Sequence, residues 1–245
     1  MKAVLFGATR GMGRSIARIL AQRGERIHLL GIGPEDLERS ARDLEVLGAP
    51  SPVEWTEIDL LDASGFAPAL DAADQALGGF DTVVMTAALF GRQEDLEDDT
   101  ERAARLLTAN FTNTVLFCEE VRRRLLARGG GRLCVFSSVA GDRGRKPVIL
   151  YGATKGGLSR YLEGLDHKFH AQGLRVLCVK PGFVKTGMTA GLRPPPFAGE
   201  PDDVARRVVR ALDRGKALIY VPPPWRYMML IIRHLPRFVM RRIGF

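Results

Sequence analysis

The sequence predicts an α/β protein with one doubly wound parallel sheet of about seven strands and helices on both faces. Short apolar runs alternate with longer amphipathic runs along most of the 245 residues, which is typical of repeated strand–helix–strand units. The short runs are almost continuously apolar, as expected for strands that a parallel sheet buries on both faces. A glycine-rich stretch follows the first of them.

Each short run is expected to be a strand and each amphipathic run a helix. The predicted strands are residues 3–6, 26–30, 53–58, 81–86, 132–137, 175–180 and 217–221. The predicted helices are residues 12–23, 34–47, 63–77, 100–128, 150–172 and 202–214. We expect one domain over residues 1–222, followed by a C-terminal appendage over residues 223–245.

The composition narrows the class of protein. A content of 46% hydrophobic and 26% charged residues predicts a globular chain. Cys118, Cys134 and Cys178 are odd in number and lie outside any CxxC spacing, so we expect reduced thiols and no metal site. We see no secretion signal and no run of the ~18–20 apolar residues that a membrane-spanning helix needs, which favours a cytoplasmic protein.

The glycine-rich stretch "FGATRGMGRSIARIL" predicts a dinucleotide site. Gly7, Gly11 and Gly13 lie between the first strand and the first helix, where a tight turn lets the backbone approach a pyrophosphate. The end of the second strand, "HLLGIG", offers no acid for the ribose of NAD. Arg10 could instead pair with a 2′-phosphate, so NADP(H) is favoured. The alternatives are NAD(H), and an Arg10 that only faces solvent.

"YGATK" places Tyr151 and Lys155 four positions apart, on one face of a predicted helix. A tyrosine has an ordinary pKa of about 10, and a nearby ammonium would lower it towards the range useful for proton transfer. Ser138 follows the strand at 132–137, at the edge where open α/β sheets bind ligands. The three side chains predict acid–base chemistry at a carbonyl, although a Tyr–Lys pair alone is more often a plain helix surface.

Five motifs in one order resemble the short-chain dehydrogenase/reductase family. They are the glycine loop, Asn110 in "ANFTNT", "SSVAG" (137–141), "YGATK" (151–155) and "PGFVKTGM" (181–188). The resemblance runs from residue 2 to about 215. It implies a Rossmann-type fold, a homodimer or homotetramer, and hydride transfer between NAD(P) and a ketone or secondary alcohol.

The resemblance also implies a catalytic tetrad. Tyr151 would exchange a proton with the substrate oxygen, and Lys155 would lower its pKa and bind the nicotinamide ribose. Ser138 would hydrogen-bond the substrate oxygen, and Asn110 would hold a water for proton resupply.

Neighbouring residues compete for two of these roles. Ser137 adjoins Ser138, but the spacing to Tyr151 favours Ser138. Asn113 lies about one helical turn beyond Asn110, which is preferred.

The cofactor residues that the resemblance implies come from four loops and from the predicted helix over residues 150–172. They are Gly7, Thr9, Arg10, Gly11, Met12, Gly13, Asp59, Leu60, Ala87, Tyr151, Lys155, Pro181, Gly182, Val184 and Thr186. Val184 and Thr186 would hold the carboxamide, and Asp59 would lie by the adenine. Phe6 replaces a threonine usual in the family, and "MTAA" (85–88) stands where "NNAG" is usual, so we expect different packing there.

The last 21 residues, "WRYMMLIIRHLPRFVMRRIGF", predict a basic amphipathic helix with a kink at Pro236. From Arg214 to Phe245 there are seven basic residues and no acid. The basic stripe is Arg226, Arg233, Arg237 and Arg241, and the apolar face is Trp225, Met228, Met229, Ile232, Leu235, Val239 and Ile243.

This pattern suits the surface of an anionic membrane, here the inner face of the cytoplasmic membrane. The alternative is a subunit contact. No motif that reads nucleic acid accompanies the arginines. The C-terminal half is also similar to actinobacterial decaprenylphosphoryl-2-keto-erythro-pentose reductases, which implies a lipid-linked keto sugar as one candidate substrate.

The sequence therefore favours an NADP(H)-dependent oxidoreductase acting on a hydrophobic or lipid-linked ketone or alcohol, with residues 187–200 as a lid. Two alternatives stay open. One is a soluble ketoreductase for small or acyl substrates whose tail serves oligomerisation. The other is a non-catalytic protein that senses NADP(H).

Overall fold

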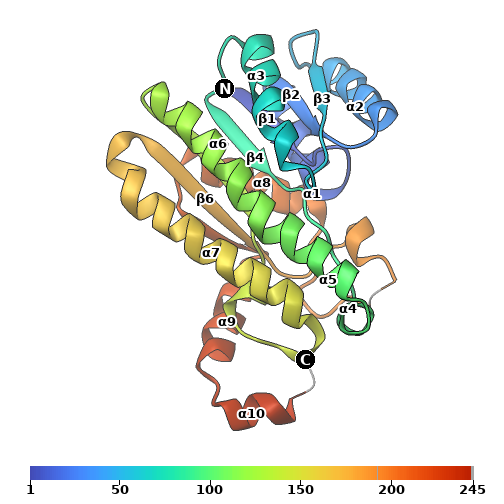
Figure 1. Ribbon diagram of the computed structural model, residues 1–245. Helices are drawn as coiled ribbons and strands as arrows, with labels where there is room; N and C mark the ends of the chain where they lie inside the picture. Colours follow the sequence, from blue (N-terminus) through green and yellow to red (C-terminus); the bar gives the residue numbers. More distant parts are fainter. Residues whose placement is uncertain (192, 244–245) are drawn as a thin grey trace.

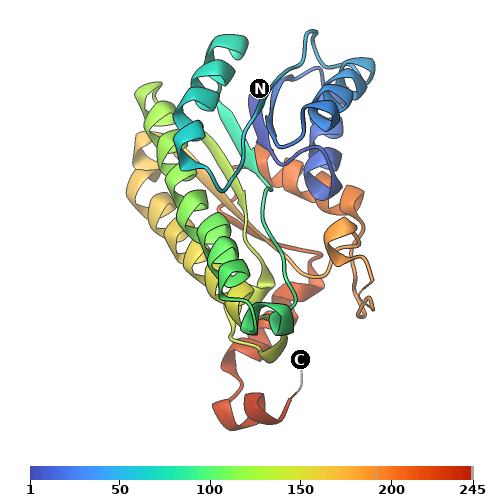
Figure 2. The same ribbon diagram turned by 45° about the vertical axis from the view of Figure 1, so that its right-hand side comes forward.

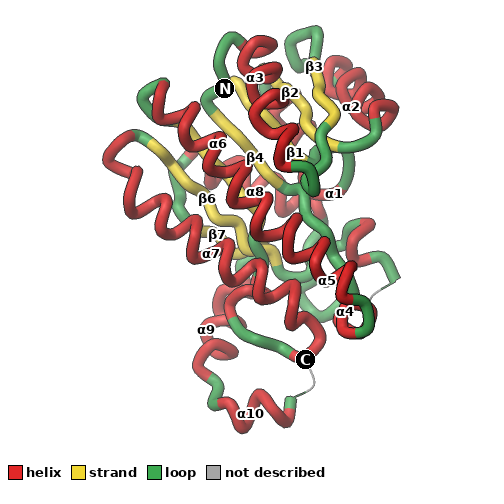
Figure 3. Tube along the Cα trace, in the orientation of Figure 1, coloured by secondary structure: helices red, strands yellow, loops and turns green. Residues whose placement is uncertain are grey.

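A computed structural model of the protein describes residues 1–191 and 193–243, and places all seven strands in one parallel sheet (Figures 1 and 3). The strands are β1 (Lys2–Phe6), β2 (Arg26–Gly31), β3 (Glu54–Glu57), β4 (Thr82–Met85), β5 (Gly131–Phe136), β6 (Leu174–Pro181) and β7 (Leu218–Val221). Their order is β3-β2-β1-β4-β5-β6-β7. The predicted doubly wound sheet is confirmed.

Helices cover both faces of the sheet, and Figure 2 shows the two layers from the side. One face packs against α1 (Gly11–Gln22), α2 (Pro34–Val46) and α8 (Pro201–Asp213). The other face packs against α3 (Phe66–Leu77), α6 (Thr114–Ala127) and α7 (Ile149–Phe169). Two hydrophobic cores therefore lie on either side of the sheet.

The central strand β1 shows why its residues are almost all apolar. Successive side chains of a strand point to opposite faces. Ala3 and Leu5 pack into one core, and Val4 and Phe6 pack into the other. The Phe6 ring meets Phe117 of α6 edge-on at a centroid distance of 5.1 Å, so the replacement of threonine by Phe6 fills space beneath that helix.

The predicted helix over residues 100–128 is interrupted. It consists of α5 (Thr100–Leu107), a π-helical turn (Thr108–Asn113) and α6. A short helix that the sequence analysis did not predict, α4 (Gln93–Glu97), precedes it. The π-helical turn indicates a functional site, since such turns are frequent where a helix carries a functional residue.

The strand order places a crevice between the carboxyl ends of β1 and β4. The chain runs outwards from β1 to β3 and returns to β4 on the other side of β1. Loops that follow neighbouring strands therefore diverge at this point, which is where open α/β sheets bind ligands.

The C-terminal segment folds as two short helices where the sequence predicted one kinked helix. They are α9 (Pro224–His234) and α10 (Arg237–Arg242), separated at Leu235 and Pro236. In Figure 1 they lie beyond the carboxyl ends of β5 and β6, next to the start of α7. Among the described residues, no helix combines the length and apolarity that crossing a bilayer requires.

Buried His28 on β2 should make the stability of the protein depend on pH. Its side chain is 2% exposed, and burial lowers its pKa from 6.5 to about 4. As the pH falls below 6.5 the unfolded state takes up the proton first, so stability decreases until about pH 4. We expect this group to cost about 2.5 kcal/mol between pH 7 and about pH 4.5.

Urea denaturation of the parent protein and the His28→Leu variant at both pH values tests this expectation. The variant should lose less stability on acidification, by about 2.5 kcal/mol. Equal losses in the two proteins would contradict it.

Candidate active site

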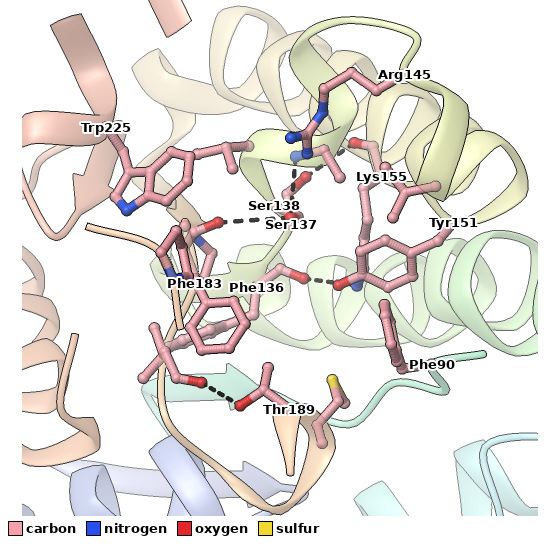
Figure 4. A pocket seen from close by; sticks show the side chains of 18 of the residues that line it. Phe90, Phe136, Ser137, Ser138, Arg145, Tyr151, Lys155, Phe183, Thr189 and Trp225 are labelled. Atoms are coloured by element: carbon pink, nitrogen blue, oxygen red, sulfur yellow. Dashed lines mark hydrogen bonds between the residues drawn. The ribbon is translucent and has the colours of Figure 1, made fainter. Parts of the chain in front are cut away.

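Tyr151, Lys155 and Ser138 meet at the carboxyl end of β5 (Figure 4). Tyr151 and Lys155 lie one turn apart on α7, with Lys155 Nζ 5.7 Å from the centre of the Tyr151 ring. Ser138 follows β5 directly and caps the short helix Val139–Asp142, accepting a hydrogen bond from the Ala140 amide at 3.1 Å. The residues that the sequence predicted as the chemical centre therefore share one site.

Glycines let α7 approach the loop after β5 at backbone distance. A Cβ on Gly152 would lie 2.8 Å from the Ala140 carbonyl oxygen. A Cβ on Gly141 would lie 2.5 Å from the backbone nitrogen of Gly156. Because neither position can hold a larger side chain without moving the backbone, these contacts fix α7 beside the loop that carries Ser138.

The competing serine, Ser137, also lines the cavity, but its hydroxyl is bonded to α7. The Ser137 hydroxyl donates to the backbone carbonyl of Lys155 at 2.9 Å and lies 2.7 Å from the Ser159 hydroxyl. Both partners belong to α7, so Ser137 fastens the strand to the helix. This leaves Ser138 as the serine placed to act on a ligand.

Burial controls the electrostatics of the Tyr–Lys pair. Lys155 is 2% exposed, its Nζ donates to the Phe136 carbonyl at 2.9 Å, and burial lowers its pKa to about 8. Burial also raises the pKa of Tyr151 to about 12, against a smaller lowering by a hydrogen bond with Ser138. The sequence predicted a lowered tyrosine pKa, whereas burial raises the pKa of Tyr151 above its ordinary value. Tyr151 is a protonated acid at neutral pH.

Asn110 lies in the π-helical turn and is fully buried. Its side-chain amide bonds the backbone of Leu89 twice, accepting from the amide nitrogen and donating to the carbonyl oxygen, each at 2.7 Å. The two bonds hold the loop after β4 against this helix. Asn113 donates instead to the Leu60 carbonyl at 2.9 Å, on the loop after β3.

The glycine loop forms a cradle against the loop after β4. Gly7 has a φ of +90°, and a Cβ there would lie 2.6 Å from the Ala87 amide nitrogen. A Cβ on Gly13 would lie 2.4 Å from the Gly7 carbonyl oxygen. The Thr86 hydroxyl donates to that oxygen at 2.9 Å. Thr86 of the "MTAA" sequence thus links the loop after β4 to the glycine loop.

The amino end of α1 fits a dinucleotide pyrophosphate. Its N-cap residue Arg10 makes no side-chain cap, and the first turn has no acid. Its amide groups and its dipole therefore favour an anion. A Cβ on Gly11 would lie 3.5 Å from Thr186 Cγ2, so the loop after β6 reaches this helix end.

Arg10 of the glycine loop contacts the first turn of α2, the helix that follows β2. Its side chain is 84% exposed and its guanidinium donates to Asp36 of α2 at 2.6 Å. The hydrogen bond from Arg10 holds the pKa of the Asp36 carboxyl below its usual value. The sequence analysis did not expect this pairing.

The other predicted cofactor residues divide into two groups. Met12, Pro181, Gly182, Val184 and Thr186 line the same cavity as Tyr151 and Lys155. Thr9 of the glycine loop lies outside that cavity, as do Asp59 and Leu60 on the loop after β3, where the Asp59 carboxylate accepts from the Leu61 amide at 2.9 Å.

A cavity of about 710 Å³ extends from Tyr151 along the C-terminal segment. The charged side chains in its lining are those of Lys155 and Arg145. The hydroxyl groups in the lining are those of Tyr151, of two serines and of three threonines. Figure 4 shows Phe90 and Trp225 on different sides of it. The α9 helix supplies one wall, formed by Trp225, Met228, Ile231 and Ile232, with Leu235 just beyond its end.

Trp225 seats α9 against the loop after β6. A Cβ on Gly182 would lie 2.2 Å from the indole ring, and the indole nitrogen donates to the Phe197 carbonyl at 3.3 Å. Arg143 also donates to the Leu235 carbonyl at 2.8 Å, and Lys146 to the Arg241 carbonyl at 2.7 Å. The tail is therefore tied to its own active site.

This arrangement changes the interpretation of the tail's predicted apolar face. Its members in α9, and Leu235, are buried or half-buried, and they pack on the rest of the chain. The spacing correctly indicated a covered face, but the sequence analysis considered only membrane and subunit contacts for it. Arg145, Phe90 and the residues of α9 that line the cavity are among the pocket residues that the sequence did not assign to the site.

Comparisons with known proteins agree with this geometry. The family model described as short chain dehydrogenase matches residues 1–196. An uncharacterized oxidoreductase of Mycobacterium tuberculosis is 33% identical over 240 residues, covering 98% of this chain and 96% of its own length. Carbonyl reductase family member 4 of Danio rerio is 30% identical, covering 86% of this chain and 90% of its own.

A solved structure extends the likeness to three dimensions. The actinorhodin polyketide ketoreductase, in a structure with NADPH, superposes with a TM-score of 0.80. It is 23% identical and the match covers 89% of this chain and 94% of that one, so this comparison supports the fold alone.

Proposed function

Because the chain belongs to the short-chain dehydrogenase family and is an oxidoreductase, we propose that it transfers a hydride between NADP(H) and an apolar ketone or secondary alcohol. The observation that carries the proposal is the group of Tyr151, Ser138 and Lys155 at one end of a largely apolar cavity. The name of the related carbonyl reductase supports the same reaction class.

In the direction of reduction, Tyr151 is the proton donor. Its raised pKa keeps the hydroxyl protonated, and the Ser138 hydroxyl next to it can donate a hydrogen bond to the same carbonyl oxygen. Polarising the carbonyl from two donors places positive partial charge on the carbon that receives the hydride. NADPH supplies that hydride when bound.

Lys155 makes the loss of the tyrosine proton less costly. A protonated ammonium beside the ring stabilises the phenolate that forms as the proton leaves. We further propose that the π-helical turn at Asn110 holds a water for proton resupply through its backbone carbonyl, since both ends of the side-chain amide are bonded to Leu89. The side chain would then act by shaping the turn.

The preference for NADP(H) over NAD(H) rests on Arg10. Its guanidinium can pair with a 2′-phosphate, and the last residues of β2 provide no acid that would bind the ribose hydroxyls. A 2′-phosphate would compete with Asp36 for the same guanidinium. Val184 and Thr186 would hold the nicotinamide end, and Asp59 and Leu60 the adenine end.

Replacing Arg10 by serine is expected to weaken NADPH binding about tenfold and to leave NADH binding nearly unchanged, because it removes one exposed phosphate contact. Fluorescence titration with both cofactors measures the two affinities. Equal weakening for NADPH and NADH would indicate a general effect on the glycine loop and contradict the assignment of NADP(H).

We infer a substrate with a large apolar part, since α9 lines the cavity with Trp225, Met228 and Ile232. A lipid-linked carbonyl compound, such as a polyprenyl-phosphate keto sugar, meets this requirement. We place the protein in the cytoplasm, as a homodimer or homotetramer. Residues 1–222 form the reductase domain, and residues 223–245 form an appendage to it that makes a peripheral membrane contact. A soluble ketoreductase with an oligomerisation tail is the alternative.

The proposal is tested by following NADPH oxidation with ketones of one head group and increasing chain length. We expect turnover, with KM decreasing as the apolar chain grows, because each buried methylene contributes about 0.8 kcal/mol. NADPH binding without turnover of any carbonyl or alcohol would favour a non-catalytic cofactor sensor. Turnover with no gain from chain length would favour the small-substrate alternative.

A further inference from the structure

The outer face of the C-terminal helices carries exposed apolar and cationic side chains together. We define this outer face as Arg226, Tyr227, Leu230, Ile231, Arg233, Arg237, Phe238 and Arg241. Tyr227, Ile231 and Phe238 are each more than 60% exposed, whereas Trp225 and Met229 on the inner side are buried. The segment therefore has an apolar set that faces its own cavity and a second one that faces outwards.

The mouth of the cavity opens beside this outer face. Ile231 lines the cavity and is also 66% exposed, so its side chain lies at the rim. Met188 marks the rim on the loop after β6, where it lines the cavity and is 43% exposed. A surface that covered the outer face would therefore lie against the entrance to the site.

The charge of the outer face indicates which kind of partner surface it can contact. Its cations are all arginines, and the sequence from Arg214 to Phe245 contains no acid that could neutralise them locally. Two copies of such a face would repel each other, so it is a poor contact between identical subunits. Arginines among exposed aromatic and aliphatic side chains suit the headgroup region of an anionic bilayer.

We propose that the outer face seats the protein on an anionic membrane, with the cavity mouth opening into the lipid. This inference rests on the proposed function for its purpose, since an apolar substrate could then pass from the bilayer to Tyr151 without crossing water. It differs from the sequence-based prediction in the residues that make the contact. The lipid-facing apolar residues are Tyr227, Leu230, Ile231 and Phe238, in place of the face led by Trp225.

Flotation with vesicles tests the contact in the absence of any substrate. The full chain is mixed with vesicles of phosphatidylcholine and phosphatidylglycerol, or of phosphatidylcholine alone, at low and high salt. We expect binding to the anionic vesicles that salt weakens, and little binding to the neutral ones. Reversing Arg237 and Arg241 to glutamate should weaken the binding at least tenfold.

A control variant changes the net charge of the protein by the same amount as the Arg237, Arg241 variant, but on another surface. Arg207 and Arg210 are exposed on α8 and lie outside the cavity lining, so the Arg207→Glu, Arg210→Glu variant carries the same change in net charge elsewhere. We expect it to bind the anionic vesicles nearly as well as the parent. Equal losses in the two double variants, or no binding by the parent, would overturn the proposal. A changed oligomeric state in the Arg237, Arg241 variant alone would also overturn it, in favour of a subunit contact.

A second measurement locates the mouth. A polarity-sensitive dye on Ile231→Cys should shift to the blue with anionic vesicles, whereas the same dye on Leu116→Cys, which is 47% exposed on α6, should not. An equal shift at both sites, or none at Ile231, would overturn the orientation. Turnover of a water-soluble ketone is recorded for the parent in parallel. Failure of that assay with intact vesicle binding would count against the proposed function and not against the membrane contact.

Discussion

Replacing Tyr151 by phenylalanine is expected to lower turnover by about 10³-fold, because it removes the hydroxyl that we propose as the proton donor to the carbonyl oxygen. The ring remains and keeps its edge-on contact with Phe90, whose centroid lies 5.2 Å away. We therefore expect the protein to stay folded and to bind NADPH with nearly the parent affinity. Single-turnover kinetics and a fluorescence titration of NADPH measure the two quantities.

Tyr161 provides a control on the same helix. Its hydroxyl donates to Glu119 at 2.7 Å, away from the cavity, so Tyr161→Phe removes the same group from α7 without touching the site. We expect that variant to lose about 1 kcal/mol of stability and to keep its turnover within about twofold. Parent-like turnover in Tyr151→Phe would remove Tyr151 from the mechanism.

Gly13→Ala is expected to damage the cofactor site and the fold together. The new methyl group would lie 2.4 Å from the Gly7 carbonyl oxygen and 2.5 Å from the Thr86 hydroxyl. One of these contacts is backbone, so α1 and the glycine loop must separate. We expect a loss of about 2–3 kcal/mol of stability and a decrease in NADPH affinity of at least about tenfold. Urea denaturation and cofactor titration measure both.

Gly164→Ala is the matched substitution. Gly164 lies in α7 and a Cβ there meets no atom within 4 Å. The change should stabilise the protein by about 0.5–1 kcal/mol, since alanine is the better helix former. If Gly13→Ala instead behaved like Gly164→Ala, the close approach of α1 to Gly7 would not be required for cofactor binding.

The fold could be predicted almost completely because its signals are local. Seven apolar runs, each followed by a helical pattern or a turn, determine a parallel sheet, and every predicted strand overlaps an observed one. The π-helical turn could not be predicted in this way. "TANFTN" contains no glycine or proline, and what accompanies the break is a pair of bonds from Asn110 to Leu89, 21 residues earlier in the chain.

The site could be predicted where its residues share a motif, and not where they meet only in space. Tyr151, Lys155 and Ser138 were found by spacing and resemblance. The wall formed by α9 was not, because a helical repeat of apolar residues shows that a face is covered without showing what covers it. The pairing of Arg10 with Asp36 could not be predicted for the same reason, since Arg10 lies in the glycine loop and Asp36 lies in α2.

The packing of Trp225 on Gly182 joins two parts of the chain with different proposed roles, one for the reaction and one for the choice of substrate. The groups proposed to hold the cofactor and to move the proton belong to the sheet, its loops and its crossover helices, whereas one wall of the pocket comes from a helix after the last strand. A different helix grafted at Pro224 could give this reductase a new substrate range while its chemistry stays intact. The C-terminal helix is thus the part of the chain whose replacement we expect to change substrate choice while the proposed reaction stays the same.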